Sequence, residues 1–276
     1  MQIFKKVAVI GIGLIGGSLA LDIKKKKLSQ EVVGVSRHKE TISLALKIKA
    51  IDKGSLSLNI IRGADLIIIA TPVDTIIGLE KEILRYAGRD CIVTDVASTK
   101  EVISKSLGGI FPNYIGSHPL AGSEKRGIMS ASCGIFKGSL CILTLGKKFS
   151  LESLKKIRKM WRVLGAKVII LDPKEHDKAL GFASHLPHII AFSLMKSIPL
   201  NTLRFSARGL KDTTRIAASD PSLWKGIFLS NRRNILKAID SFQGNLNKIK
   251  SAIKTNDAKA LEKILLKSQK IRELLK

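Results

Sequence analysis

The sequence predicts an α/β fold with a doubly wound parallel sheet, followed by an all-helical domain. In residues 1–172, short apolar runs alternate with helical patterns, which is the order of repeated strand–helix–strand units. After Asp172-Pro173 the strand patterns almost vanish, and long helical periodicities continue to the C-terminus. We therefore expect a sheet domain over residues 1–172 and a helical domain over residues 173–276.

The first expected strand, Val7–Ile10, leads directly into a glycine-rich turn and a helix over Ile15–Lys26. Gly11, Gly13 and Gly16 have the spacing of a dinucleotide-binding turn. The first glycine permits a tight turn, the second leaves room for a pyrophosphate, and the third lets helix and strand pack closely. Free N–H groups at the helix start favour phosphate. The expected residues of this Rossmann-type cofactor site are Gly11, Gly13, Leu14, Ile15 and Gly16.

The later elements of the sheet domain continue the alternation. Leu66–Ala70 is continuously apolar, as expected of a parallel strand covered on both faces. Pro72 suits the first position of the helix that follows. Further strands are expected at Val32–Val35, Ile92–Asp95, Tyr114–Gly116, Cys141–Leu145 and Ala166–Ile170, and further helices at Lys39–Lys49, Val73–Tyr86, Thr99–Leu107 and Leu151–Leu164.

The end of the second strand bears on the choice between NAD and NADP. An acidic residue there would bind the ribose hydroxyl of NAD, but this chain has Ser36 and Arg37. Ser36 can bind a hydroxyl or a phosphate, and the fork of Arg37 suits a 2′-phosphate. The pair slightly favours NADP or dual use, unless Arg37 only stacks on the adenine. Thr71 and Pro72, after the strand at 66–70, complete the expected cofactor-binding residues.

Two segments of the sheet domain carry candidate catalytic residues. Ser98 follows the strand at 92–95, and Ser98-x-x-Glu101 has the spacing of a capping box, a role that leaves its hydroxyl proton free for a ligand. His118 follows the expected strand at 114–116 and precedes a proline and a polar loop. Ligands of open α/β sheets bind at this edge, so His118 is placed for proton transfer near a nicotinamide.

The helical region holds further candidates. His185 and His188 are three residues apart and share a helix face, but their spacing and the lack of a carboxylate companion do not fit a metal site. Lys211 and Arg215 lie one turn apart and can clamp a carboxylate, unless they form a solvated basic face. Asp220-Pro221 predicts a helix start.

A stripe of large apolar residues marks the C-terminal part of the chain. Its spacing of 4, 3, 4, 3 and 4 residues suits packing against other helices. Its members are Ile235, Ile239, Phe242, Leu246, Ile249 and Ile253. The stripe is either the inside of a helix bundle or a subunit interface, and we expect a homodimer through the C-terminal helices.

Composition narrows the class of protein. Lys and Arg number 48 against 22 Asp and Glu, a net charge of +26, yet the lysines are spread along the chain without interleaved aromatics. This pattern favours a solvated basic surface over a nucleic-acid-binding protein with a relic nucleotide domain. Three cysteines without a C-x-x-C pair suggest a reducing cytoplasm. Apolar runs are too short for a membrane span.

Five motifs, taken in order, resemble the prephenate/arogenate (cyclohexadienyl) dehydrogenase family of tyrosine biosynthesis. They are Gly11–Ser18, Thr94–Lys100, Gly116–Gly127, Ser184–His188 and Lys211–Trp224. The resemblance implies a Rossmann domain with a helical dimerisation domain. It also implies oxidative decarboxylation of prephenate to 4-hydroxyphenylpyruvate, with hydride transfer to NAD(P)+ and no metal.

In this resemblance His118 accepts a proton or hydrogen bond from the substrate hydroxyl, Ser98 orients the hydroxyl or the imidazole, and Arg215 anchors a carboxylate. Arogenate, alone or beside prephenate, stays open as the substrate. A β-hydroxyacid-type dehydrogenase is a lesser alternative, since it needs a lysine where this chain has histidines. The expected substrate-binding residues are Arg215, Lys211, His188, His185 and Trp224.

Overall fold

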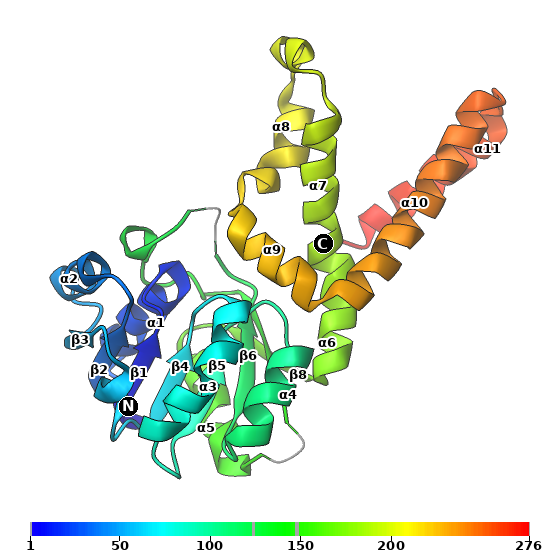
Figure 1. The fold of residues 1–276 in the computed structure, drawn as a ribbon. Helices are drawn as coiled ribbons and strands as arrows, with labels where there is room; N and C mark the ends of the chain where they lie inside the picture. The colour runs from blue at the N-terminus through cyan, green and yellow to red at the C-terminus, as the bar shows by residue number, and fades with distance from the viewer. Residues whose placement is uncertain (1, 123–124, 147–148, 276) are drawn as a thin grey trace. The chain divides into compact units, whose positions relative to one another are not determined.

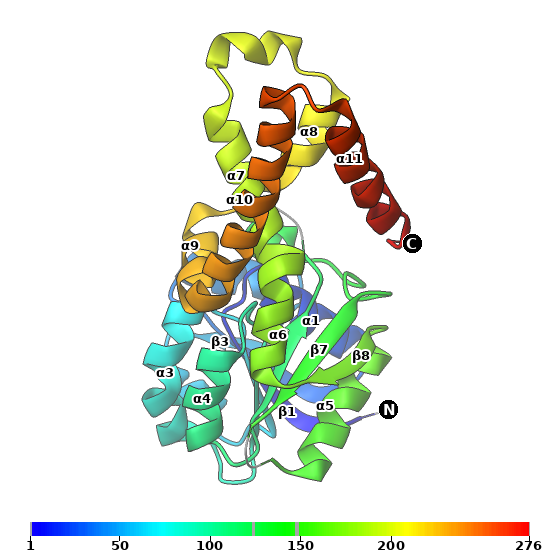
Figure 2. The ribbon, with the colours of Figure 1, turned by 90° about the vertical axis from the view of Figure 1, so that its right-hand side faces the viewer.

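The computed structural model describes residues 2–122, 125–146 and 149–275 (Figures 1 and 2). The chain forms two compact units, Met1–Asn231 and Arg232–Lys276. The strands and the helices up to α9 belong to the first unit, and helices α10 and α11 form the second. The expected domain division at residues 172–173 falls between strand β8 and helix α6, and it stays a prediction.

A five-stranded parallel sheet forms the centre of the first unit. Its strand order is β3-β2-β1-β4-β5, so the order reverses between β1 and β4. In such sheets ligands bind outside the carboxyl ends of the strands at that reversal. The strands are β1 (Phe4–Ile10), β2 (Ser29–Val35), β3 (Lys53–Ser55), β4 (Leu66–Ile69) and β5 (Ile92–Asp95).

Buried side chains cover both faces of this sheet. Along β1, Val7 and Val9 belong to one core cluster, whereas Ala8 and Ile10 belong to another. Successive side chains of a strand point to opposite faces, so the two clusters mark two covered faces. This confirms the predicted doubly wound fold. The helices of this region are α1 (Leu14–Lys25), α2 (Lys39–Lys47), α3 (Val73–Tyr86), α4 (Glu101–Ile110) and α5 (Leu151–Val163), with short turns η1 (Leu58–Ile61) and η2 (Ile128–Ser130).

The last three strands form a separate sheet. Its order is β6-β7-β8, with β6 (Ile115–Pro119) antiparallel to β7 (Leu140–Leu145) and β8 (Lys167–Leu171) parallel to β7. In the described residues, β6 is linked to the parallel sheet by an isolated bridge between Val93 and Tyr114, just before β6, and by a hydrogen bond of 2.9 Å between the hydroxyls of Thr94 and Ser117. The expected strands at 141–145 and 166–170 thus pair with β6 in a second sheet beside the five-stranded one. Helix α5 is a crossover that makes β7 and β8 parallel, whereas the connection from β6 to β7 has no α-helix in its described part.

A run of helices follows β8 within the first unit. Helix α6 (Pro173–Leu180), a π-turn (Gly181–His185) and α7 (Leu186–Ser197) follow one another without a break. Asp172 caps α6 by accepting the N–H of Lys174 at 2.8 Å, and Asp220 caps α9 (Pro221–Ser230), as predicted for Asp220-Pro221. Between them lie η4 (Leu200–Phe205), α8 (Arg208–Thr214) and η5 (Arg215–Ala218).

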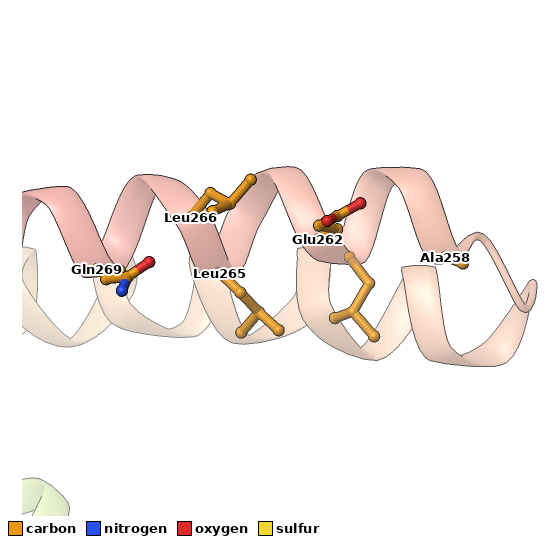
Figure 3. A pocket seen from close by; sticks show the side chains of 6 residues that line it. Ala258, Glu262, Leu265, Leu266 and Gln269 are labelled. Carbon is orange, nitrogen blue, oxygen red and sulfur yellow. The ribbon is translucent and has the colours of Figure 1, made fainter.

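The second unit is a pair of helices, α10 (Arg232–Lys254) and α11 (Ala258–Glu273). The predicted stripe lies on α10, where Leu246 is 50% and Ile253 63% exposed. On α11, Leu265 and Leu266 are 55% and 48% exposed, and Figure 3 shows both beside Glu262. Among the described residues, no helix is long and apolar enough to cross a bilayer.

Candidate active site

The glycine turn between β1 and α1 has the predicted geometry. Gly11 has a φ of +92°, and a Cβ there would lie 2.7 Å from the carbonyl oxygen of Ala70. A Cβ on Gly16 would overlap the carbonyl oxygen of Gly11. At Gly13, by contrast, a Cβ would meet no described atom within 4 Å. The turn is thus crowded on the protein side and open at Gly13, which fits a phosphate lying against the backbone.

The start of α1 suits an anion. Gly13 is its N-cap, so no side chain occupies the first N–H groups, and the first turn contains no acidic residue. Leu14 and Ile15 are the first residues of the helix. Unsatisfied N–H groups and the positive end of the helix dipole both favour negative charge. The residues present therefore fit the diphosphate of a dinucleotide.

Thr71 lies at the same edge, directly after β4 and Ala70. Its Oγ1 is buried and has no hydrogen-bond partner among the described residues. Buried hydroxyls normally form a hydrogen bond, so this one is available to bond a ligand. Pro72 is the N-cap of α3 rather than its first residue, a shift of one position from the prediction.

Ser36 and Arg37 follow β2, as predicted. Ser36 is half-buried, and its Oγ accepts the N–H of His38 at 3.2 Å. Arg37 is exposed. The serine hydroxyl proton and the guanidinium are both able to donate to a phosphate at the end of the strand.

The capping box predicted at Ser98 is wrong. Helix α4 begins at Glu101 without a local side-chain cap. Instead, the carboxylate of Asp177 in α6 accepts the N–H groups of Lys100 and Glu101 at 2.7 and 2.9 Å. A carboxylate at a helix N-terminus is favoured by the dipole. Ser98 stays half-buried in the β5–α4 loop.

A buried ionic group braces the loop that carries Ser98. Lys100 is fully buried and forms an ion pair with Asp95. Its Nζ also donates to the carbonyl oxygens of Ala97 at 2.8 Å and Thr99 at 3.2 Å, one on each side of Ser98. The other carboxylate oxygen of Asp95 accepts the hydroxyl of Tyr114 at 2.6 Å. The hydrogen bonds of the Lys100–Asp95 ion pair therefore fix the backbone of this loop.

His118 lies inside β6 rather than after it, and its side chain is 7% exposed. Its Nδ1 lies 2.8 Å from Nε2 of His176, whose Nδ1 lies 2.8 Å from Oδ1 of Asp177. Burial holds the pKa of His118 well below its ordinary value of 6.5, and the charges of His176, Lys100 and His185 lower it further. His118 is therefore a neutral imidazole near pH 7, the form that accepts a proton.

Sequence reasoning did not identify His176 and Asp177 as site residues. The available signal was weak, namely a His-Asp pair in the first helix after β8. Its link to His118 depends on α6 packing beside α4 and β7 (Figure 2).

Three predicted residues meet in the helical part of the first unit. His188 stacks on Trp224 with ring centroids 3.5 Å apart, and His185 contacts the same indole edge-on at 6.1 Å. The Nδ1–H of His188 donates to the carbonyl oxygen of Ser184 at 3.0 Å, so the neutral ring has its lone pair at Nε2. Burial lowers the pKa of His188, and the charge of Arg215 lowers it further.

His185 is 1% exposed and has one nitrogen without a partner. Asn231 donates its amide N–H to Nδ1 at 3.1 Å, so the proton of the neutral ring is on Nε2. Burial lowers the pKa of His185 to about 4. Its Nε2–H has no acceptor among the described residues, as expected of a group that a ligand completes.

Arg215 is the first residue of η5, and Lys211 lies one turn earlier in α8. Both are exposed. The charge of Arg215 lowers the pKa of His188, so the guanidinium acts on the ring that stacks on Trp224. Lys211 adds a second exposed cation to the same segment, which suits an anionic ligand.

The glycine turn, the open helix start and a neutral buried imidazole define the class of an NAD(P)-dependent oxidoreductase with a Rossmann-type sheet. Two family models cover nearly the whole chain. One, described as prephenate dehydrogenase, nucleotide-binding domain, matches residues 19–170, and the other, prephenate dehydrogenase, dimerization domain, matches residues 172–267. The chain belongs to the prephenate dehydrogenase family.

Individual relatives agree with this family. The chain is 36% identical to a prephenate dehydrogenase of Lactococcus lactis, over 98% of the chain and 77% of the relative. It is 32% identical to a cyclohexadienyl dehydrogenase of Zymomonas mobilis, over 100% and 98%. Among solved structures, prephenate dehydrogenase of A. aeolicus with hydroxyphenyl propionate and NAD+ superposes with a TM-score of 0.93 at 31% identity, over 99% and 98% of the two chains.

Proposed function

We propose that this protein catalyses the oxidative decarboxylation of prephenate to 4-hydroxyphenylpyruvate with NAD(P)+. The observation that carries the proposal is the neutral, buried imidazole of His118 in a chain of the prephenate dehydrogenase family. The test is the formation of reduced nicotinamide from prephenate and from arogenate, each with NAD+ and with NADP+. Absence of turnover with both substrates would contradict the proposal.

His118 is the proposed base. A coenzyme with its diphosphate at the glycine turn would supply the hydride acceptor for the hydrogen on ring C4. His118 accepts the proton of the C4 hydroxyl at its free nitrogen, and Ser98 orients that hydroxyl or the imidazole. As C4–O becomes a carbonyl, the bond from C1 to the carboxylate breaks, CO2 leaves and its electron pair makes the ring aromatic. The proton on His118 then returns to the phenolate oxygen, so no net proton is released.

The helical part of the first unit has groups for a dianionic substrate. Arg215 is the proposed anchor of one carboxylate, with support from Lys211, because a guanidinium binds a carboxylate in two-point geometry. The Nε2–H of His185, which has no acceptor in the described part of the chain, is a further donor, and the indole of Trp224 is the proposed apolar contact. These roles place the charged groups of the substrate beside the helical part of the first unit.

Replacing Arg215 with Ala should raise the KM for prephenate and reduce kcat/KM by about 2–4 kcal/mol, because a charge-assisted contact is lost. Initial rates over a range of prephenate concentrations measure this. Arg208→Ala is the matched control, since Arg208 is an exposed arginine of the same segment that pairs with Asp212. An unchanged KM in Arg215→Ala would refute the anchor role.

Arogenate is the second candidate substrate, and His188 favours it. Arogenate carries an ammonium group where prephenate has a keto oxygen. Donation from His188 to a keto oxygen does not suit its tautomer, since Nδ1–H donates to Ser184 and the neutral Nε2 only accepts. An acceptor at Nε2 suits an ammonium group, so use of both substrates is proposed. A solved relative, arogenate dehydrogenase of Synechocystis, has a TM-score of 0.85 at 27% identity, over 98% of this chain and 100% of the relative.

NADP or dual use is proposed for the coenzyme. Arg37→Ala should weaken NADP binding by about 10- to 100-fold and NAD binding far less, because a charge-assisted contact to the 2′-phosphate contributes about 1.5–3 kcal/mol. Titration of coenzyme by fluorescence measures both dissociation constants. Lys39→Ala, which removes an exposed cation two residues away, is the control. Equal losses for both coenzymes would place Arg37 on the adenine or outside the site.

A homodimer through α10 and α11 is also proposed. Its support is the match to the family's dimerization domain and the exposed Leu246, Ile253, Leu265 and Leu266 of these helices. Exposed apolar side chains in such number are typical of a surface that another subunit covers. A cytoplasmic location is proposed with it, because Cys91, Cys133 and Cys141 are free thiols.

A further inference from the structure

A chain of buried polar groups extends from His118 into helix α6. Nδ1 of His118 lies 2.8 Å from Nε2 of His176, and Nδ1 of His176 lies 2.8 Å from Oδ1 of Asp177. His176 is 0% and Asp177 1% exposed. The catalytic steps proposed above use only His118, so the other two groups have no role in them.

The carboxylate end sets the direction of these hydrogen bonds. Oδ1 and Oδ2 of Asp177 already accept the N–H groups of Lys100 and Glu101, so this carboxylate acts as an acceptor. It therefore accepts from His176 as well, and the proton of His176 must be on Nδ1. The opposite tautomer would direct the lone pair of His176 at the carboxylate and leave two acceptors facing each other.

The tautomer of His176 in turn determines which nitrogen of His118 carries the proton. With its proton on Nδ1, neutral His176 has a bare Nε2, which can only accept. His118 must then donate its Nδ1–H to His176, which leaves the lone pair of His118 on Nε2. Burial lowers the pKa of His118 and also that of His176, although the hydrogen bond to Asp177 raises the latter. Both rings are thus neutral before a substrate binds.

We propose that His176 and Asp177 are positioning residues that fix His118 in the tautomer with a bare Nε2, the nitrogen that takes the substrate's hydroxyl proton. The inference rests on the proposed function of His118. A ring with its only proton on Nε2 would be a donor toward the hydroxyl and unable to act as the base. A hydrogen bond at the second nitrogen of a histidine commonly sets which nitrogen is reactive.

The surrounding charges are consistent with this role. The β5–α4 loop contributes the ion pair of Lys100 and Asp95, and the π-turn contributes His185. The ammonium of Lys100 disfavours a positive charge on His118, whereas Asp177 lies at the far end of the hydrogen-bond chain from the substrate. When His118 takes a proton, its bond to His176 becomes charge-assisted and therefore stronger. Burial and the charge of Lys100 nevertheless keep the pKa of His118 low, so the base is neutral at rest.

The tautomer can be measured without any turnover. Nitrogen NMR of the whole enzyme, labelled at its histidine rings, distinguishes a protonated ring nitrogen from a bare one, and the spectrum of His118→Asn assigns the signals of His118. We expect a protonated Nδ1 and a bare Nε2 at pH 7. A protonated Nε2 with a bare Nδ1 in the wild-type enzyme would overturn the inference.

Two substitutions of His176 separate positioning from packing. In His176→Gln the amide oxygen can accept from His118 and the amide N–H can donate to Asp177, so kcat should stay within about threefold of wild type. His176→Phe keeps an aromatic ring but no acceptor, so kcat should fall by about 10- to 100-fold, the usual effect of losing such a supporting partner. The coenzyme dissociation constant should not change in either. A purely structural role for His176 predicts the reverse order, with Phe tolerated better than Gln.

The outcomes separate this inference from the proposed function. If the wild-type enzyme turns over neither prephenate nor arogenate, the proposed function fails, while the NMR result still decides the tautomer. If the enzyme is active and Phe and Gln lose equal activity, the positioning role is refuted and the function stands. If His176→Phe does not fold, the NMR spectrum of the wild-type enzyme and the activity of His176→Gln remain decisive.

Discussion

Replacing His118 with Asn lowers kcat for prephenate by about 10²–10⁴-fold, the range expected when a general base is removed. The amide of Asn can still form a hydrogen bond but cannot accept the hydroxyl proton at neutral pH. Coenzyme binding should change little, because the glycine turn and Thr71 belong to other elements of the unit. Steady-state rates with saturating prephenate measure the loss.

The pH dependence of the wild-type enzyme tests the same role of His118 as a base. His118 works as a base only while neutral, so activity is lost as the pH falls through its pKa in the folded enzyme. Burial places that pKa well below 6.5, hence kcat/KM should not decline as the pH is lowered through 6.5. Coenzyme titration by fluorescence is the control for intact binding. Wild-type turnover in His118→Asn would remove His118 from the mechanism.

Replacing Lys100 with Met lowers the free energy of unfolding by about 3–5 kcal/mol, the cost typical of breaking a buried ion pair. Lys100 and Asp95 are both 0% exposed, so the substitution leaves an uncompensated carboxylate in the core. The carbonyl oxygens of Ala97 and Thr99 also lose their donor. Urea unfolding followed by circular dichroism measures the change.

Two further variants make this test specific. The double variant Lys100→Met with Asp95→Asn should recover part of the loss, because it also removes the carboxylate charge that the single variant leaves buried without a partner. Lys24→Met is the matched control: Lys24 and Asp52 also form an ion pair, but their side chains are 26% and 37% exposed. Such a pair contributes about 0–1 kcal/mol. Equal losses in Lys24→Met and Lys100→Met would show that burial is not the cause.

Local patterns predicted the cofactor end of the site. The roles of Gly11 and Gly16 follow from backbone geometry within a few residues, and the structure has that geometry. The continuous apolar run at β4 and the caps at Asp172 and Asp220 are likewise local features. In each case the residues that decide the structure are close together in sequence.

The proton-transfer end depends on contacts that are distant in sequence. Whether β6 joins the parallel sheet is decided by how the connection to β7 returns, and no local pattern reports this. The cap of α4 comes from Asp177, 76 residues beyond Glu101, so a plausible local box at Ser98 was misleading. His176 likewise becomes relevant only once α6 packs beside α4 and β7.

The π-turn at Gly181–His185 determines how the histidines are oriented about a shared axis. It accommodates one residue more than a regular helix between His176, in α6, and His188, in α7. Because the turn absorbs this extra residue, deleting one residue there would restore regular winding and leave His188 in about its present orientation relative to His176. The same number of residues wound as a regular α-helix would instead rotate His188 by about 100° and separate it from the indole of Trp224. The wide turn, rather than the number of residues alone, therefore decides which way α7 presents His188.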